Sequence, residues 1–206
     1  CDALILHLNV KYCRPVSRDG RTVLSTALGR NFEQPLSSTY RADFVYSITA
    51  SRPDYVDVEL NARHGPLGTG NYRISLEAVG LANERAFVHL RYSYTYGFAG
   101  RLAMEMYLST SGSDKVGFTV IKGPKDSPPE FIGGVRGAIE RNTMRYYLAV
   151  DAYLGALATP VPARFEQSLE RWFSATELYP RQLREIDRDA YFAMKRSEYV
   201  RQQTAQ

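Results

Sequence analysis

The chain has 206 residues, of which 44% are hydrophobic and 23% are charged. This length suits one domain, with or without an appendage, and the composition excludes a disordered chain. No apolar run approaches the roughly 18 residues of a membrane-spanning helix. The net charge of +4 is spread along the sequence without a block of lysine and arginine. We therefore expect no nucleic-acid partner, whereas peripheral contact with an anionic membrane surface stays open.

Residues 1–12 are apolar with a mixed period, which fits either the end of a helix or a buried strand. Cys1 and Cys13 are the only cysteines. A single helix would hold them about 18 Å apart, so a disulfide requires that this segment is not one helix. The start without Met indicates trimming from a longer chain rather than the lipid-anchored cysteine of a bacterial lipoprotein. The compartment, cytoplasmic or periplasmic, stays open.

After a turn at residues 14–21, the sequence shows short segments in which apolar and polar side chains alternate. Turn residues separate them, which predicts an antiparallel meander with one solvent-exposed face and one buried face. The 15 tyrosines suit such strands, and they equally suit the walls of a wet cavity. The predicted strands are 39–50, 55–62, 72–79, 85–96, 101–109 and 115–121.

A proline-rich loop at residues 122–130 ends the strand region, and the pattern then changes to a helical one. Residues 133–158 form the longest predicted helix, because apolar side chains recur there at helical spacing. Two more helices are predicted at 164–178 and from Pro180 to the end of the chain. Strands followed by helices predict an α+β fold with helices on one face of an antiparallel sheet.

A curved antiparallel sheet followed by one long helix resembles the START-like, helix-grip (SRPBCC-type) superfamily. The stretch "GGVRGAIERNTMRYYLAVDAYL" after "KVGFTVI" is similar to uncharacterised bacterial proteins of this class, some of them exported. The resemblance covers residues 1–158 and implies a sheet wrapped around the long helix, with an apolar or amphipathic ligand between them.

Two departures from the superfamily pattern concern the ends of the chain. The superfamily opens with a strand and two short helices, so the resemblance implies that the N-terminal part of the domain is missing here. It normally ends with the long helix, whereas this chain adds a helical extension at residues 159–206. Because the extension contains Trp172, Phe173 and Tyr191, we expect it to pack on the domain.

The long helix contains polar side chains that need an explanation. Asn142 and Tyr146 lie in its apolar stripe, and a buried Asn requires a partner, which is a strand side chain, a water or a ligand head group. Arg141 and Arg145 are four residues apart and like-charged. Such a pair is unfavourable unless an acid meets it, for which Glu59, Glu77 and a ligand anion are candidates.

The segment 85–96 supplies further candidates for the site. Alternation places His89 and Arg91 on one face of the strand and Tyr92 and Tyr94 on the other. If the tyrosine face is the buried one, the first pair is solvated, whereas an arginine inside a cavity would anchor a carboxylate. The predicted ligand-binding residues are Tyr92, Tyr94, Asn142, Tyr146, His89 and Arg91.

Catalytic motifs are absent from the sequence. His7, His64 and His89 are far apart, and no metal-binding or nucleophile motif occurs. We therefore expect no catalytic residue, metal or cofactor, and we expect non-catalytic binding or transport of a lipid-like molecule. The alternatives are a cyclase- or hydrolase-like enzyme of the same fold, and a structural module that binds a protein partner through residues 161–206.

Overall fold

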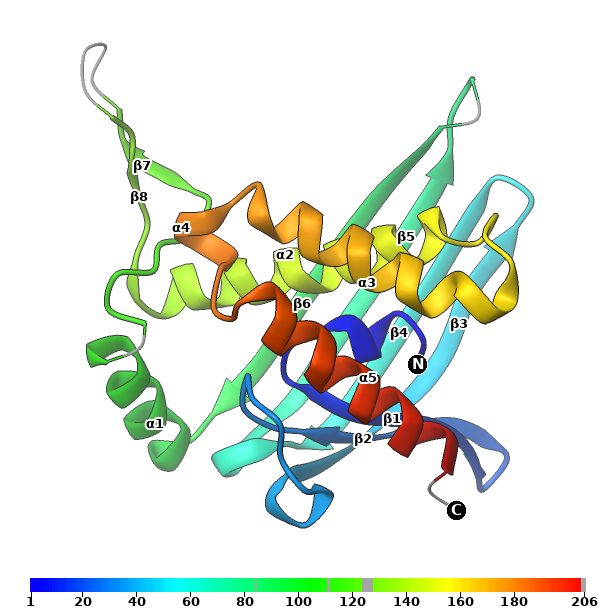
Figure 1. Cartoon of the computed structure of the whole chain (residues 1–206), viewed down its shortest axis with the longest axis horizontal. Coiled ribbons are helices and arrows are strands. Elements are labelled where there is room, and N and C mark those ends of the chain that lie inside the picture. The colour runs from blue at the N-terminus through cyan, green and yellow to red at the C-terminus, as the bar shows by residue number, and fades with distance from the viewer. Residues whose placement is uncertain (84, 111, 124–127, 205–206) are drawn as a thin grey trace.

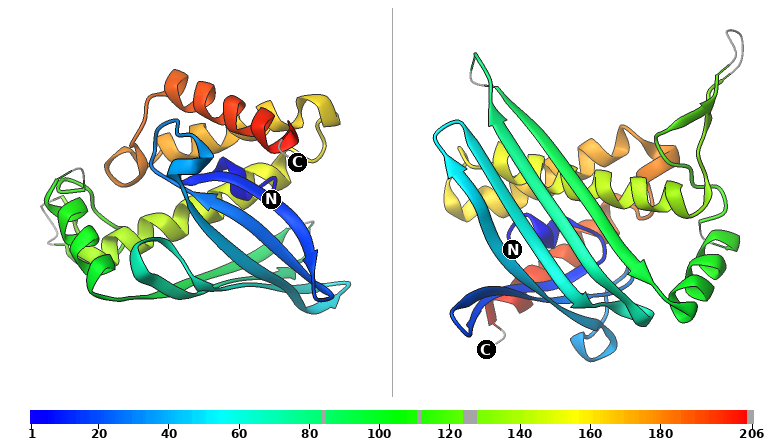
Figure 2. Two further views of the ribbon diagram at one scale, coloured as in Figure 1. Left: turned by 90° about the horizontal axis from the view of Figure 1, so that it is seen from below. Right: turned by 180° about the vertical axis from the view of Figure 1, so that it is seen from behind.

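A computed structural model describes residues 1–83, 85–110, 112–123 and 128–204 of the chain. The fold is α+β, as predicted, with a six-stranded antiparallel sheet whose strands lie in sequence order. Figure 2 shows that the helices lie on one side of this sheet, while the first two strands cross the later ones steeply. The strands are β1 (Val10–Arg18), β2 (Arg21–Leu28), β3 (Tyr40–Arg52), β4 (Tyr55–His64), β5 (Thr69–Gly80) and β6 (Ala86–Tyr96).

The predicted strands that correspond to β3, β4, β5 and β6 are confirmed, but the turn predicted at residues 14–21 is too long. β1 continues to Arg18, and β2 begins at Arg21. Only Asp19 and Gly20 form the turn, with φ values of 50° and 72°. Asp-Gly is a typical two-residue hairpin sequence because both positions need a positive φ.

The segment 101–109 was predicted as a strand, and this is wrong, because it lies within the helix α1 (Phe98–Ser109). Alternating Leu102, Met104 and Met106 imitate a strand, yet Ala, Leu, Met and Glu are all strong helix formers. Of the strand predicted at 115–121, only the end belongs to β7 (Val120–Lys122), which pairs with β8 (Glu130–Phe131). In the predicted loop between them, residues 124–127 lie outside the described residues.

The predicted helices of the C-terminal half are confirmed with small shifts at their ends. α2 (Gly134–Gly155) is the longest helix, and α3 (Val161–Glu177) follows it. The restart at Pro180 gives the short α4 (Pro180–Leu183) and then α5 (Arg188–Thr204). Within the described part of the chain, no helix combines the length and the apolar character needed to cross a membrane. Three 3-10 turns complete the fold: η1 (Leu4–Leu6), η2 (Leu36–Ser38) and η3 (Pro66–Gly68).

The helices α2, α3 and α5 share a core with the N-terminal segment. Trp172 on α3 and Tyr191 on α5 are buried and stacked, with ring centroids 4.8 Å apart. The hydroxyl of Tyr191 donates to the backbone oxygen of Leu6 at 2.8 Å. Figure 1 shows α5 beside the first residues of the chain, so the last helix closes the core around the first turn.

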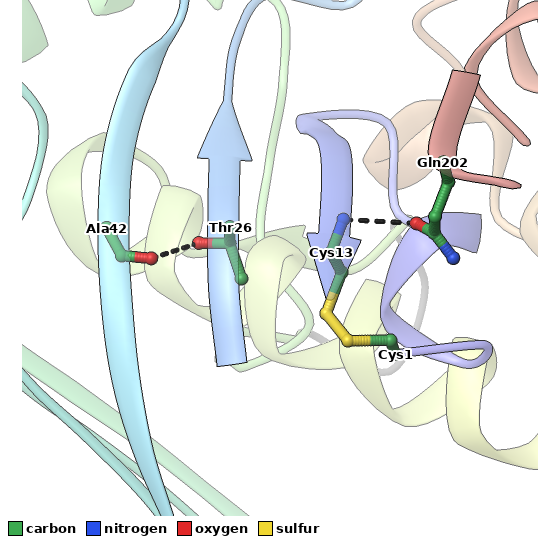
Figure 3. The surroundings of a disulfide bond; sticks show 5 residues. All are labelled: Cys1, Cys13, Thr26, Ala42 and Gln202. Carbon is green, nitrogen blue, oxygen red and sulfur yellow. Dashed lines mark hydrogen bonds between the residues drawn. A yellow bond between two sulfur atoms is a disulfide. The ribbon is translucent and has the colours of Figure 1, made fainter. Parts of the chain in front are cut away.

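The N-terminal segment is a 3-10 turn that leads into β1, so it is not one helix. This geometry places the Cα atoms of Cys1 and Cys13 only 5.2 Å apart, and the two cysteines form a disulfide. Figure 3 shows this bond beside α5, whose Gln202 accepts a hydrogen bond from the backbone N–H of Cys13 at 3.0 Å. Of the two possibilities that the sequence left open, the structure has the disulfide.

A buried ionic cluster also joins α5 to the start of the chain. Glu198 accepts hydrogen bonds from Lys11 at 2.9 Å and from Lys195 at 2.8 Å, and all three side chains are fully buried. Lys195 also donates to the backbone oxygens of His7 and Val10, at 2.7 and 2.9 Å. Burial lowers the pKa of Lys195 to about 8, with Glu198 opposing the shift.

Candidate ligand-binding cavity

Two adjoining hollows lie between the sheet, α1 and α2. One is mainly apolar and has a volume of about 260 Å³, and the other is mainly polar, with about 210 Å³. They share four lining residues, Tyr92, Tyr94, Met104 and Tyr107, so we treat them as an apolar and a polar compartment of one cavity. Each alone is smaller than a typical small-molecule pocket of about 300–1,000 Å³, but together they fall within that range.

Tyrosines from β5 and β6 form one wall of the apolar compartment. The two-residue period of a strand points Tyr92 and Tyr94 to the same face, and Tyr72 of β5 lies beside them. The rings of Tyr72 and Tyr94 are stacked, with centroids 5.2 Å apart. Burial raises the pKa of Tyr92, with the nearby Tyr146 and Tyr72 hydroxyls adding to the effect. Its hydroxyl therefore stays neutral and acts only as a hydrogen-bonding group.

Helix α1 and the 3-10 turn η3 form the opposite wall. Met104 and Tyr107 of α1 line both compartments, and Pro66 and Leu67 of η3 line the apolar one. The helix approaches the sheet closely at Gly100, where an added Cβ would lie 3.1 Å from the Cβ of Tyr96. The connection between β4 and β5 therefore contributes to the cavity wall.

The polar compartment contains a short hydrogen-bond network. Arg145 of α2 donates to Glu185 at 2.7 Å, and the Tyr107 hydroxyl approaches the same carboxylate oxygen at 3.4 Å. Arg141 donates from Nη2 to the Tyr107 hydroxyl at 2.9 Å. The guanidinium groups are nearly inaccessible, since Arg141 is 1% exposed and Arg145 is 4% exposed. The acid that meets Arg145 is thus Glu185, which reaches Arg141 only through the Tyr107 hydroxyl. The predicted partners Glu59 and Glu77 are wrong.

Asn142 lies where the polar compartment meets the N-terminal segment. Its side-chain oxygen is 3.0 Å from Nε2 of His7. The imidazole of His7 is buried and stacks on Tyr146, with ring centroids 4.4 Å apart. Burial, followed by the positive charge of Arg145, lowers the pKa of His7 well below its ordinary value. A neutral histidine therefore holds Asn142 in place.

The structure brings together some of the residues predicted for the site and separates others. Tyr92, Tyr94 and Asn142 line the polar compartment. Tyr146 lies behind them, with its ring centroid 5.6 Å from that of Tyr92, and does not line either hollow. Tyr146 therefore supports the wall through ring contacts.

His89 and Arg91 lie on the outer face of the sheet. Both are exposed, and they contact Glu77 at 3.1 and 3.4 Å. Hydrogen bonds from Tyr55 and then from His89 lower the pKa of Glu77. This arrangement corresponds to the solvated alternative of the sequence analysis, so we leave His89 and Arg91 out of the cavity.

Sequence reasoning missed Tyr72, Met104, Tyr107 and Glu185. The first had a usable signal, because Tyr72 begins a predicted strand on its apolar face. Met104 and Tyr107 were obscured by the mistaken strand at 101–109. Glu185 carries no local signal, because its partner Arg145 is 40 residues away in the chain.

A second, larger groove lies on the sheet and shares Tyr72 with the lining of the apolar compartment. It has a volume of about 840 Å³ and contains arginines that are scattered in the sequence but lie on neighbouring strands. Their side chains form no hydrogen bond or ion pair with any other residue that the structure describes. We call this surface the arginine groove; its arginines are Arg21, Arg41, Arg63 and Arg73.

Among the described residues, no group of three His, Cys, Asp or Glu side chains is placed to hold a metal ion. Comparison with protein-family models gave no match to this chain, and comparisons with curated proteins and with solved structures gave none either. Function is therefore inferred from the geometry of the cavity.

Proposed function

We propose that this protein binds or carries an apolar or amphipathic, lipid-like small molecule, without catalysing a reaction on it. The ligand lies in the cavity between the sheet, α1 and α2, and the resemblance to the helix-grip superfamily supports a ligand between a sheet and a helix. The observation that carries the proposal is the pairing of an apolar compartment with a polar one that shares Tyr92, Tyr94, Met104 and Tyr107. Few soluble ligands other than amphiphiles match both halves.

The apolar part of the ligand lies against the tyrosine rings and Met104. Removal of apolar surface from water contributes about 25 cal/mol per Å², and the tyrosine rings provide much of that surface without a charged group. Tyrosine hydroxyls and the Asn142 amide orient the polar end, as the few polar groups of such pockets commonly do.

The first test is native mass spectrometry of the purified protein, followed by organic extraction. We expect a co-purifying apolar mass in near-stoichiometric amount. A protein without an adduct that also shows no thermal shift with a panel of lipids would contradict the proposal.

A pair of variants on one helix locates the ligand. Met104→Trp fills the junction of the two compartments, so it should abolish retention of the ligand. Met106→Trp is the matched control, because Met106 is 62% exposed on α1. Equal retention by both variants would place the ligand outside this cavity.

A further inference from the structure

The charges around the polar compartment do not balance. Arg141, Arg145 and Lys115 lie near one another, and the nearby carboxylate is that of Glu185, which Arg145 already holds at 2.7 Å. Burial lowers the pKa of Lys115, with Arg145 and Arg141 adding to the shift and Glu185 opposing it. The compartment therefore has an excess of positive charge in a place with little access to water.

Arg141 is only partly hydrogen-bonded. It is 1% exposed, and its one hydrogen bond runs from Nη2 to the neutral hydroxyl of Tyr107. Nε and Nη1 find no acceptor within the part of the chain that the structure describes. Buried guanidinium nitrogens normally have partners, because a buried unpaired charge is costly. An arginine kept in this state on the wall of a cavity is suited to an incoming anion.

We propose that the ligand of this cavity is an amphiphile with a single negatively charged head, which binds Arg141 in the polar compartment while its tail occupies the apolar one. This inference rests on the proposed function and specifies its ligand class. The planar guanidinium matches a carboxylate in geometry, with two parallel hydrogen bonds. The Asn142 amide lines the same compartment and adds a neutral donor.

A neutral or cationic head fits the compartment less well. A neutral head leaves the guanidinium charge of Arg141 uncompensated. A cationic head would add to the existing positive excess, because Glu185 is already bound to Arg145. The structure thus favours an anion through both the charge balance and the free hydrogen-bond donors.

The arginine groove offers a second place where an anion could bind. Arg73 is exposed there and lines neither compartment of the cavity, so it supplies a control for unspecific attraction of negative charge. A test must therefore distinguish the contribution of the head group to the affinity from that of the tail. It must also distinguish binding in the cavity from binding in the arginine groove.

The experiment uses three probes with one tail and different heads: decanoate, decanol and decylammonium, each below its aggregation concentration. Isothermal titration with the delipidated full chain measures their affinities. We expect decanoate to bind at least about tenfold more tightly than decanol, since a charged hydrogen-bonded pair contributes more than a neutral one. Arg141→Gln should remove this preference while binding of decanol changes little, and Arg73→Gln should leave the preference intact.

The possible outcomes separate the two proposals. Equal affinity of the wild-type protein for decanoate and decanol overturns the anionic head, while binding in the cavity stands. Absence of binding by every probe overturns the proposed function itself. A decanoate preference that survives Arg141→Gln but disappears in Arg73→Gln assigns the anion to the arginine groove. If Arg141→Gln fails to fold, Arg141→Lys takes its place. This variant keeps the positive charge but cannot form the two parallel hydrogen bonds of a guanidinium, so it should bind decanoate more weakly than the wild-type protein.

Discussion

His7 donates a hydrogen bond from Nε2 to the side-chain oxygen of Asn142 across 3.0 Å, although the two residues are 135 positions apart. The direction follows from the other ring nitrogen, because the backbone N–H of Asn9 donates to Nδ1 at 3.2 Å. Nδ1 is therefore an acceptor, and the single proton of the neutral imidazole is on Nε2. The oxygen of Asn142 is thus fixed by His7, and the Asn142 side chain also hydrogen-bonds the hydroxyl of Tyr92.

Asn142→Leu should therefore destabilise the fold as well as alter the cavity. The substitution leaves the buried Nε2–H of His7 without an acceptor, which costs about 1–3 kcal/mol. Denaturant unfolding followed by circular dichroism measures the loss. Asn61→Leu is the control, because the Asn61 side chain donates to Glu59 on the same strand. An unchanged midpoint for Asn142→Leu would show that the His7 contact contributes nothing.

The stability of the protein should fall when the pH drops from 6.5 to 5. The unfolded chain takes up a proton on His7 near its ordinary pKa, whereas the folded chain does not, since burial and then Arg145 and Lys195 lower that pKa. The unfolded state thus binds more protons in this window, and the free energy of unfolding decreases by up to about 1.4 kcal/mol per pH unit.

The contribution of His7 is measured as the difference in slope between the wild-type protein and His7→Gln. The slope should be smaller in the variant. His64→Gln provides the control because His64 is exposed, and it should keep the wild-type slope. Identical slopes for all three proteins would mean that His7 titrates normally in the folded state.

Glu198→Gln should be among the most damaging single substitutions. It leaves Lys11 and Lys195, both fully buried, without their shared carboxylate. Loss of one partner from a buried ionic cluster costs about 3–5 kcal/mol. Glu166→Gln breaks the exposed pair with Arg196 between α3 and α5, and such pairs contribute less than about 1 kcal/mol. Similar unfolding midpoints for the two variants would contradict the role of the cluster.

Deletion of residues 161–206 should prevent folding. The deletion removes Trp172, Tyr191 and Glu198, which are buried against the N-terminal segment and α2. We expect a protein without near-ultraviolet circular dichroism that is rapidly digested by protease. A stable, protease-resistant 1–160 fragment would instead support the alternative in which this region is a separate surface for a protein partner.

Side-chain patterns identify β3 to β6 and α2 because apolar residues recur there at the spacing of a strand or a helix. Alternation on β6 correctly separates Tyr92 and Tyr94 from His89 and Arg91, since neighbouring side chains of a strand must point to opposite faces. The same rule fails at 101–109, where Leu102 and Met106 are half or more exposed and Met104 faces the cavity. Alternation there reflects no sheet, and helix propensity is the better indicator.

The polar compartment could not be predicted in the same way. Arg141 and Arg145 are visible in the sequence as a like-charged pair, but nothing local indicates that Tyr107 and Glu185 meet them. The same holds for Lys11 and its partner Glu198, which are 187 positions apart. Contacts of this kind depend on how separate elements pack. They leave no periodic side-chain pattern in the sequence from which they could be predicted.

The bonds that α5 makes with the first turn of the chain also determine when the protein can fold. Tyr191 and Lys195 bind backbone oxygens of residues 6, 7 and 10, across sequence separations of 185 to 188 residues. During synthesis, the N-terminal segment has no partner for these bonds until α5 has left the ribosome. Early strands are exposed throughout that interval, which makes folding slow and sensitive to aggregation. A growing chain of this protein therefore needs protection from aggregation, by chaperones for example, until α5 emerges.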